Sequence, residues 1–157
     1  ITPATVQDTI RITELIRTAF GVVARRFDLT RENCPKHPSH STEHWVANDL
    51  ARGVRFYLAR VKDEVAGCMG MEHASEAACY LERLAVHPEA QRRGVGAALV
   101  RHGIEEAGRL GVEKVGVAII AEQSELARWY QGLGFFPTGT RQFPHLPFDV
   151  AFLEYQI

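Results

Sequence analysis

The chain has 157 residues, with 18 Lys and Arg against 19 Asp and Glu, for a formal net charge of −1. A chain of this length buries roughly 70% of its unfolded surface, so we expect one domain over residues 1–157. The balanced charge excludes an overall field for nucleic acid or an anionic membrane, and no apolar run approaches the ~18 residues of a membrane span. Because the charge is balanced, nucleic acid is not expected as a partner. Because there is no apolar run of that length and the first residues show no signal-peptide pattern, a membrane is not expected either.

The cysteines indicate a compartment. Cys34, Cys68 and Cys79 are odd in number, and two of them lie in strand-like runs. This usage suits a reducing environment better than a disulfide framework, so we expect a cytoplasmic protein.

The N-terminal half is predicted to contain two helices followed by three strands. Pro35 and Pro38 exclude a regular helix between the two helices. The expected elements are a short strand at Ile1–Thr5, a helix with apolar positions from Leu15 to Phe27 and a Thr5–Asp8 cap, a loop over Asp28–Ser41, a helix capped by Ser41 or Thr42 and ending at Gly53, and strands at Val54–Val61, Val65–His73 and Ala77–Val86.

The C-terminal half alternates helices with strands. The run Val112–Ile120 is β-branched with little alternation, which is typical of a strand covered on both faces. The other expected elements are a helix from Gly94 to Gly108 or Gly111, a helix at Ser124–Leu133, and strands near Phe136–Phe143 and Phe148–Tyr155. The order of elements predicts a mixed α/β sheet in one domain.

The stretch Leu81–Val100 reads as a strand, a His-Pro break, a basic turn with two glycines, and the start of a helix. A helix start exposes unpaired N–H groups and the positive end of the helix dipole. The glycines Gly94 and Gly96 allow the backbone to approach an anion closely. The stretch therefore predicts a site for the pyrophosphate of a nucleotide cofactor.

Three glycine-rich motifs compete for this stretch. A Walker loop needs Gly-Lys-Ser/Thr, which Gly94–Ala97 lacks. A dinucleotide fingerprint needs a small residue where Leu99 stands, and it should lie near the start of an alternating βαβ domain. The form that fits is Gln91-Arg92-Arg93-Gly94-Val95-Gly96, the acetyl-CoA signature Gln/Arg-x-x-Gly-x-Gly/Ala.

Two further features accompany this motif, namely Leu84-Ala85-Val86-His87-Pro88 before it and Trp129-Tyr130 followed by Gly134-Phe135 after it. With them the chain resembles the GNAT superfamily of N-acetyltransferases over most of its length. The segments Phe143–Phe148 and Cys34–Pro38 resemble a subgroup of small bacterial GNAT proteins whose substrates are unassigned. The resemblance implies a mostly antiparallel sheet of about six or seven strands, splayed between the fourth and fifth, with about four helices.

The resemblance also implies how acetyl-CoA is held. Backbone groups of Leu84, Ala85 and Val86 would pair with the pantetheine arm, and backbone N–H groups of the basic turn would wrap the pyrophosphate. The residues of that turn are Arg92, Arg93, Gly94, Val95, Gly96 and Ala97. Gln123 stands where relatives often carry an Asn that binds the pantetheine, and a solvated basic turn is the alternative role of Arg92 and Arg93.

The catalytic residues are expected to be Tyr130 and Glu82. Tyr130 occupies the GNAT position whose phenol usually faces the sulfur, and its alternative role is that of a core aromatic on the amphipathic helix. Trp129 is expected to fill the core instead. The fifth-strand Glu of some relatives is Ala118 here, so Glu82 on the fourth strand is the substitute base, unless it only pairs with Arg83 or Lys114.

Several residues are expected near the acceptor amine. Glu72 and His73, at the end of the neighbouring strand, could share or replace Glu82 as the base, directly or through a chain of water molecules. The spacing Cys34-x-x-His37-x-x-His40 provides three ligands without a fourth, so no metal is expected, and the loop is instead expected to wall the acceptor pocket. His37, His40, Glu72 and His145 are therefore the candidate acceptor contacts, with a structural role as the alternative for each histidine.

The sequence thus predicts an enzyme that transfers the acetyl group of acetyl-CoA to a primary amine of a small molecule or protein. Two alternatives stay open: a non-catalytic acyl-CoA-binding regulatory module and, from a third class, a nucleotide-binding NTPase. An exposed strand edge of such a sheet also leaves a homodimer open.

Overall fold

A computed structural model describes residues 1–157, and its centre is one seven-stranded sheet with the order β1-β2-β3-β4-β5-β7-β6. Neighbouring strands are antiparallel except for the parallel pair β4 and β5. The strands are β1 (Thr2–Pro3), β2 (Arg55–Val61), β3 (Glu64–His73), β4 (Ala78–Val86), β5 (Lys114–Ile120), β6 (Phe136–Arg141) and β7 (Val150–Gln156). The helices are α1 (Thr9–Arg26), α2 (Glu43–Ala51), α3 (Val95–Leu110) and α4 (Ser124–Gly132).

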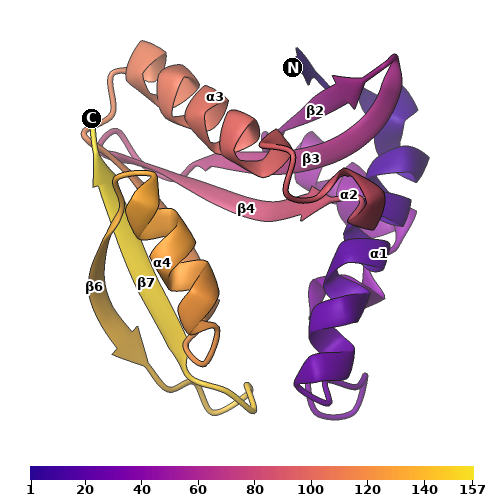
Figure 1. The fold of residues 1–157 in the computed structure, drawn as a ribbon, viewed down its shortest axis with the longest axis vertical. Helices are drawn as coiled ribbons and strands as arrows, with labels where there is room; N and C mark the ends of the chain where they lie inside the picture. The colour runs from indigo at the N-terminus through magenta and orange to yellow at the C-terminus, as the bar shows by residue number, and fades with distance from the viewer.

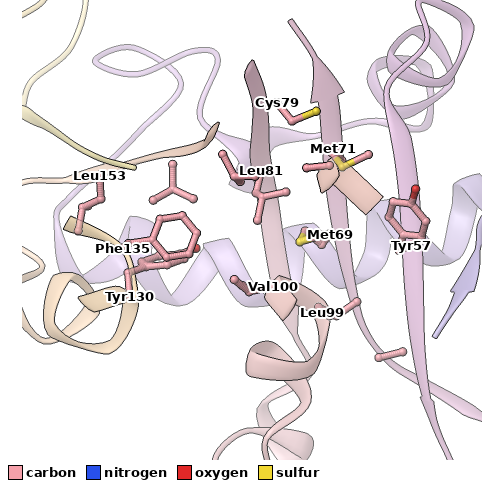
Figure 2. Close-up of a cluster of buried hydrophobic side chains, with 14 of the residues drawn as sticks. Tyr57, Met69, Met71, Cys79, Leu81, Leu99, Val100, Tyr130, Phe135 and Leu153 are labelled. Atoms are coloured by element: carbon pink, nitrogen blue, oxygen red, sulfur yellow. The ribbon is translucent and has the colours of Figure 1, made fainter. Parts of the chain in front are cut away.

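The helices cover both faces of the sheet (Figure 1). Helices α3 and α4 pack on one face, which we call the α3 face, over an 18-residue apolar cluster that contains Met69, Leu81 and Val115. Figure 2 shows part of this cluster, with Tyr130 and Phe135 at the end near Leu153 of β7. Helices α1 and α2 pack on the opposite face, the α1 face, over a second cluster of nine buried residues. The two clusters supply the apolar burial that stabilises the fold.

The sheet splits between β4 and β5. These strands pair only where Ala78–Tyr80 faces Lys114–Gly116. Residues 81–86 of β4 and 117–120 of β5 do not pair with each other. We call this opening the fork. A register shift between β3 and β4 accompanies it, with Arg83 in the left-handed region at φ +52°. Such a bulge bends a strand and interrupts its ladder, so it helps to turn β4 away from β5.

The wide end of the fork is bridged on the α1 face. Ile120, at the end of β5, packs in a small cluster with Ala24 of α1 and with Leu29 and Cys34 of the following loop. Leu146 and Phe148, from the β6–β7 connection, pack against the same cluster. An ion pair between Arg26 of α1 and Glu125 of α4 also crosses between the two halves of the sheet.

The predicted mixed α/β sheet, its splay and its four helices are confirmed, and the differences lie mainly at element ends. The first strand shortens to Thr2–Pro3 because the Thr5–Asp8 capping box starts a single 3₁₀ turn at Val6. Thr42, rather than Ser41, caps α2 by accepting from the Trp45 N–H at 3.3 Å. A 3₁₀ turn at Pro38–His40 occupies the proline-rich loop. No helix has both the length and the apolar character required to cross a bilayer.

Candidate active site

The turn between β4 and α3 presents a row of free backbone N–H groups. Arg92 and Gly94 adopt left-handed conformations, with φ of +61° and +80°. No hydrogen bond within the protein uses the N–H groups of residues 92–97, and the first α3 bond is Ala98 N–H to the Gly94 carbonyl. Successive N–H groups at a helix start form an anion-binding concavity. The turn therefore has the donor set that a pyrophosphate requires.

The side chains of this turn leave those donors accessible. Arg92 and Arg93 are exposed, and neither forms an ion pair with a carboxylate of the chain. The Gln91 side-chain amide donates to the Val86 carbonyl at 3.2 Å, which ties the turn to the end of β4. This positioning role was not predicted, although Gln91 opens the motif. Gly96 packs closely against Trp129, as shown by the position of a Cβ built on Gly96, which would lie 3.4 Å from the indole ring.

The fork continues from this turn along β4. Leu84 and Val86 are half-buried against the α3-face cluster, whereas Ala85 is buried in the α1-face cluster. Their stretch of β4 has no β5 partner, so it offers a strand edge to an extended ligand arm. Gln123 lies at the start of α4, is half-buried, and makes no side-chain hydrogen bond in its cap position. The predicted cofactor residues thus lie at the turn, on the stretch of β4 that β5 does not pair with, and at the start of α4.

Glu82 lies on β4 beside the fork without a strong partner. Its Oε1 is buried and accepts no hydrogen bond, and the nearest cation is Arg52, whose Nη2 lies 4.0 Å away. Burial raises the pKa of Glu82, and the negative charges of Asp49 and Glu72 raise it further, against the lowering effect of Arg83 and Arg52. A half-buried carboxylate with a raised pKa is suited to accept a proton near neutral pH.

A network of ion pairs explains why Glu82 has no hydrogen-bond partner. Asp49 of α2, with 8% of its side chain exposed, pairs with Arg83 and also accepts from Arg52 at 3.0 Å. Arg52 in turn binds Glu72 at 3.0 Å. Lys114, the other expected partner of Glu82, binds Glu154 at 2.7 Å instead. The Arg83 and Lys114 pairings considered for Glu82 are therefore wrong. Asp49 and Arg52 were missed, since no local pattern links α2 to β4.

Tyr130 lies deeper than its neighbour. It is 5% exposed and meets the Trp129 and Phe135 rings edge to face, with centroids 4.9 and 5.3 Å away. Trp129 is only half-buried, so the expectation that Trp129 rather than Tyr130 fills the core is wrong. Burial raises the pKa of Tyr130, and no hydrogen bond within the chain involves its hydroxyl. The hydroxyl is protonated at neutral pH and is free to donate.

The candidate acceptor residues occupy different settings on the α1 face. Glu72 pairs with Arg52 at the end of β3, and His145 is exposed beside the Phe143 ring. His37 is 6% exposed, and its Nδ1 lies 2.7 Å from the Ser39 hydroxyl; burial lowers its pKa to about 4. The Nε2 of His40 is buried without a hydrogen-bond partner.

Of these four residues, His37 and His40 meet edge to face with ring centroids 6.3 Å apart, whereas Glu72 and His145 contact other residues. No group of three His, Cys, Asp or Glu side chains has an arrangement that could hold a metal. His37 serves as the cap of its own turn, since it also accepts from the Ser39 N–H. Ala118 lies exposed on β5 opposite Phe152, and its methyl group offers no base at the fork.

Comparison with known proteins identifies the family of this chain. The model of the acetyltransferase (GNAT) family matches residues 12–135. The chain therefore belongs to the GNAT acetyltransferase family. That match contains the turn, the fork, Glu82 and Tyr130.

One relative by sequence and two solved structures illustrate the similarity. The GCN5-related N-acetyltransferase 6, chloroplastic, of Arabidopsis thaliana is 28% identical in an alignment of 127 residues. The match covers 76% of this chain and 44% of the relative, so the chain spans less than half of the relative's length. The ribosomal-protein-S18-alanine N-acetyltransferase of Escherichia coli superposes with a TM-score of 0.76 at 18% identity, over 99% of this chain and 92% of its own. The structure of yncA from Salmonella typhimurium with its cofactor acetyl-CoA superposes with a TM-score of 0.72 at 20% identity, over 98% of this chain and 91% of its own.

Proposed function

We propose that this chain transfers the acetyl group of acetyl-CoA to a primary amine of a small molecule or a protein. The observation that carries the proposal is the run of N–H groups at residues 92–97. These groups have no acceptor within the chain and follow the end of β4 at the wide end of the fork. In this proposal the N–H groups of Arg92 to Ala97 bind the pyrophosphate. Backbone groups of Leu84, Ala85 and Val86 bind the pantetheine arm, with Gln123 at its side.

Acetyl-CoA would supply a thioester whose carbonyl carbon accepts the amine. The chain must then hold the amine in its neutral form and take up its proton. Glu82 is proposed to be that base, since its Oε1 has no hydrogen-bond partner and its raised pKa suits a proton acceptor. Glu72 is the alternative acceptor of the proton, directly or through water. Its Oε1 lies 3.0 Å from Arg52, whereas the Oε1 of Glu82 lies 4.0 Å from the same guanidinium.

Two further groups are proposed to assist. A backbone N–H on the free edge of β4 stabilises the charge that develops on the carbonyl oxygen, an effect worth about 3–4 kcal/mol per donor in other enzymes. Tyr130 donates its hydroxyl proton to the departing sulfur. Its raised pKa keeps that proton on the oxygen at neutral pH, and the hydroxyl has no competing partner within the chain.

The test is release of CoA thiol from acetyl-CoA across a panel of amines, with wild type compared to Tyr130→Phe. Turnover with at least one amine, reduced in the variant, is the expected result. Binding of CoA without turnover on any amine would instead indicate a regulatory acyl-CoA-binding module. A rise in melting temperature with ATP but not with CoA would refute the cofactor assignment and favour a nucleotide-binding protein.

Three further predictions accompany this proposal. Residues 1–157 act as a single domain, and the protein is cytoplasmic because its cysteines suit a reducing compartment. A homodimer is the third, since β6 is an edge strand whose residues are all exposed. Sedimentation of the purified chain tests the last of these.

A further inference from the structure

A second recess lies on the α1 face, at the closed end of the fork. It has a volume of about 200 Å³, and its lining includes Tyr80, Gly116, Thr138, Arg141, Phe152 and Glu154. We call it the Tyr80 hollow. Tyr80 and Gly116 form the last pair between β4 and β5 before the strands separate. The hollow therefore adjoins the fork on the face that carries Glu82.

Gly116 shapes this hollow. A Cβ at Gly116 would lie 2.7 Å from two carbons of the Tyr80 ring, so the ring lies directly over the backbone of β5. Tyr80 is nevertheless 44% exposed, which leaves one side of the ring open to solvent. The hollow thus has a backbone floor and an aromatic wall, with Phe152 of β7 as a second aromatic side chain.

The charges in the hollow are unequal. Glu154 is neutralised by Lys114, whose Nζ lies 2.7 Å from its Oε1. Arg141 has no carboxylate partner in the chain, and its guanidinium carbon stands 5.0 Å from the centroid of the Phe143 ring. A guanidinium held on an aromatic ring keeps its donors free for a planar anion, and a carboxylate is the common partner.

Spacing connects the hollow to the reacting amine. Tyr80 and Glu82 are two residues apart on one strand, so they point to the same face about 7 Å apart. Arg141 lies on β6, three strand spacings from β4, and lines the hollow together with Tyr80. A molecule with its amine at Glu82 and its carboxylate at Arg141 therefore needs a chain that crosses the hollow between the two groups. A free α-amino acid is too short for both contacts.

We propose that the acceptor carries a carboxylate several bonds from its amine, and that Arg141 in the Tyr80 hollow binds this carboxylate while Tyr80 and Phe152 flank the intervening chain. The inference rests on the proposed acetyl transfer and specifies its substrate class. Two sources present this chemistry: an ω-amino acid, and a peptide N-terminus with an acidic second residue.

The experiment compares matched acceptors. 6-Aminohexanoate is assayed against hexylamine, and a peptide with Asp at its second position against the same peptide with Asn. We expect the carboxylate-bearing member of at least one pair to have a kcat/KM about ten- to a hundredfold higher, the range of a charged hydrogen bond. The pair that shows the larger ratio identifies the source.

Arg141→Gln should remove most of this ratio through KM for the carboxylate-bearing acceptor and leave the uncharged member unchanged. Arg101→Gln is the matched control, because Arg101 is exposed on α3 and forms no ion pair in the chain. A ratio near one in wild type, or an equal loss on both members in Arg141→Gln, would overturn the inference. Turnover of hexylamine in either case would leave the proposed function intact.

Binding provides a measurement that does not depend on turnover. Calorimetry of the CoA-loaded protein with 6-acetamidohexanoate, the corresponding product, should show binding that Arg141→Gln weakens about tenfold or more and Arg101→Gln does not. Equal affinity of the two variants would refute the carboxylate site, whether or not any amine is acetylated. Failure to acetylate any amine would count against the proposed function alone.

Discussion

Replacing Glu82 by Gln should remove activity while making the protein more stable at neutral pH. The glutamate Oε1 is buried without a hydrogen-bond partner, and Asp49 and Glu72 add negative charge nearby. Loss of the proton acceptor should lower kcat/KM by about 10²–10⁴-fold, the usual contribution of a general base. A group so placed is expected to cost stability when it is charged.

The sign of the pH dependence follows from the raised pKa. Between the ordinary value of 4.5 and the higher folded value, the folded protein binds more protons at Glu82 than the unfolded chain. The contribution of Glu82 to stability therefore falls as pH rises through this window. The amide of Gln keeps an oxygen acceptor at this place but removes the buried charge, whose desolvation opposes folding. Because 29% of the Glu82 side chain is exposed, we expect a modest gain of about 1 kcal/mol.

The assay combines thiol release with thermal melts of wild type and Glu82→Gln at pH 5 and pH 8. A gain of about 1 kcal/mol corresponds to roughly 2–4 °C in a domain of this size, and it should be larger at pH 8 than at pH 5. Glu105→Gln is the control, since Glu105 is exposed on α3 and forms no ion pair. Unchanged kcat/KM would exclude Glu82 as the base, and a lower melting temperature at pH 8 would refute the account of its burial.

Three other tests use four substitutions, one of which, Gly111→Ala, is a control outside the site. Asp49→Asn should lower the free energy of unfolding by about 2–4 kcal/mol in urea, because the half-buried Arg83 loses its charged partner; a change below about 0.5 kcal/mol would contradict this role. Tyr130→Phe should reduce kcat with little change in melting temperature, since the lost hydroxyl makes no hydrogen bond in the chain; equal kcat would remove the proposed proton donor. Gly94→Ala and Gly111→Ala should each cost about 1–2 kcal/mol, because both positions have positive φ at an end of α3. Only Gly94→Ala should weaken CoA binding in calorimetry, and equal weakening by both would show that stability alone is responsible.

Much of the fold could be predicted from the sequence because its signals are local. Helical spacing of apolar residues located α1 and α4, and turn residues such as Lys62 and Asp63, both left-handed, separated β2 from β3. The motif from Gln91 to Gly96 likewise marked the anion-binding turn, since its glycines, its basic residues and the following helix are adjacent in the chain. Element ends were less accurate, because caps and ladder pairing decide them.

The candidate catalytic groups depended on contacts that no local pattern encodes. The sequence suggested Glu82 but also gave it Arg83 as a partner, whereas Asp49, 34 residues earlier, binds Arg83 instead. Likewise, amphipathic spacing could not rank Trp129 and Tyr130, because the packing of Phe135 beside Tyr130 decides which ring is enclosed.

By itself, then, the sequence determined the order of the elements, the class of the sheet and the phosphate-binding turn, because each depends on residues within a few positions of one another. Only the tertiary structure decided where charge is left unpaired. The Asp49–Arg83 and Lys114–Glu154 ion pairs leave the Glu82 Oε1 at the fork without a hydrogen-bond partner and Arg141 in the Tyr80 hollow without a carboxylate partner. Which charged groups lack a partner depends on the distances between segments that are far apart in the sequence. Hydrophobic periodicity does not predict those distances.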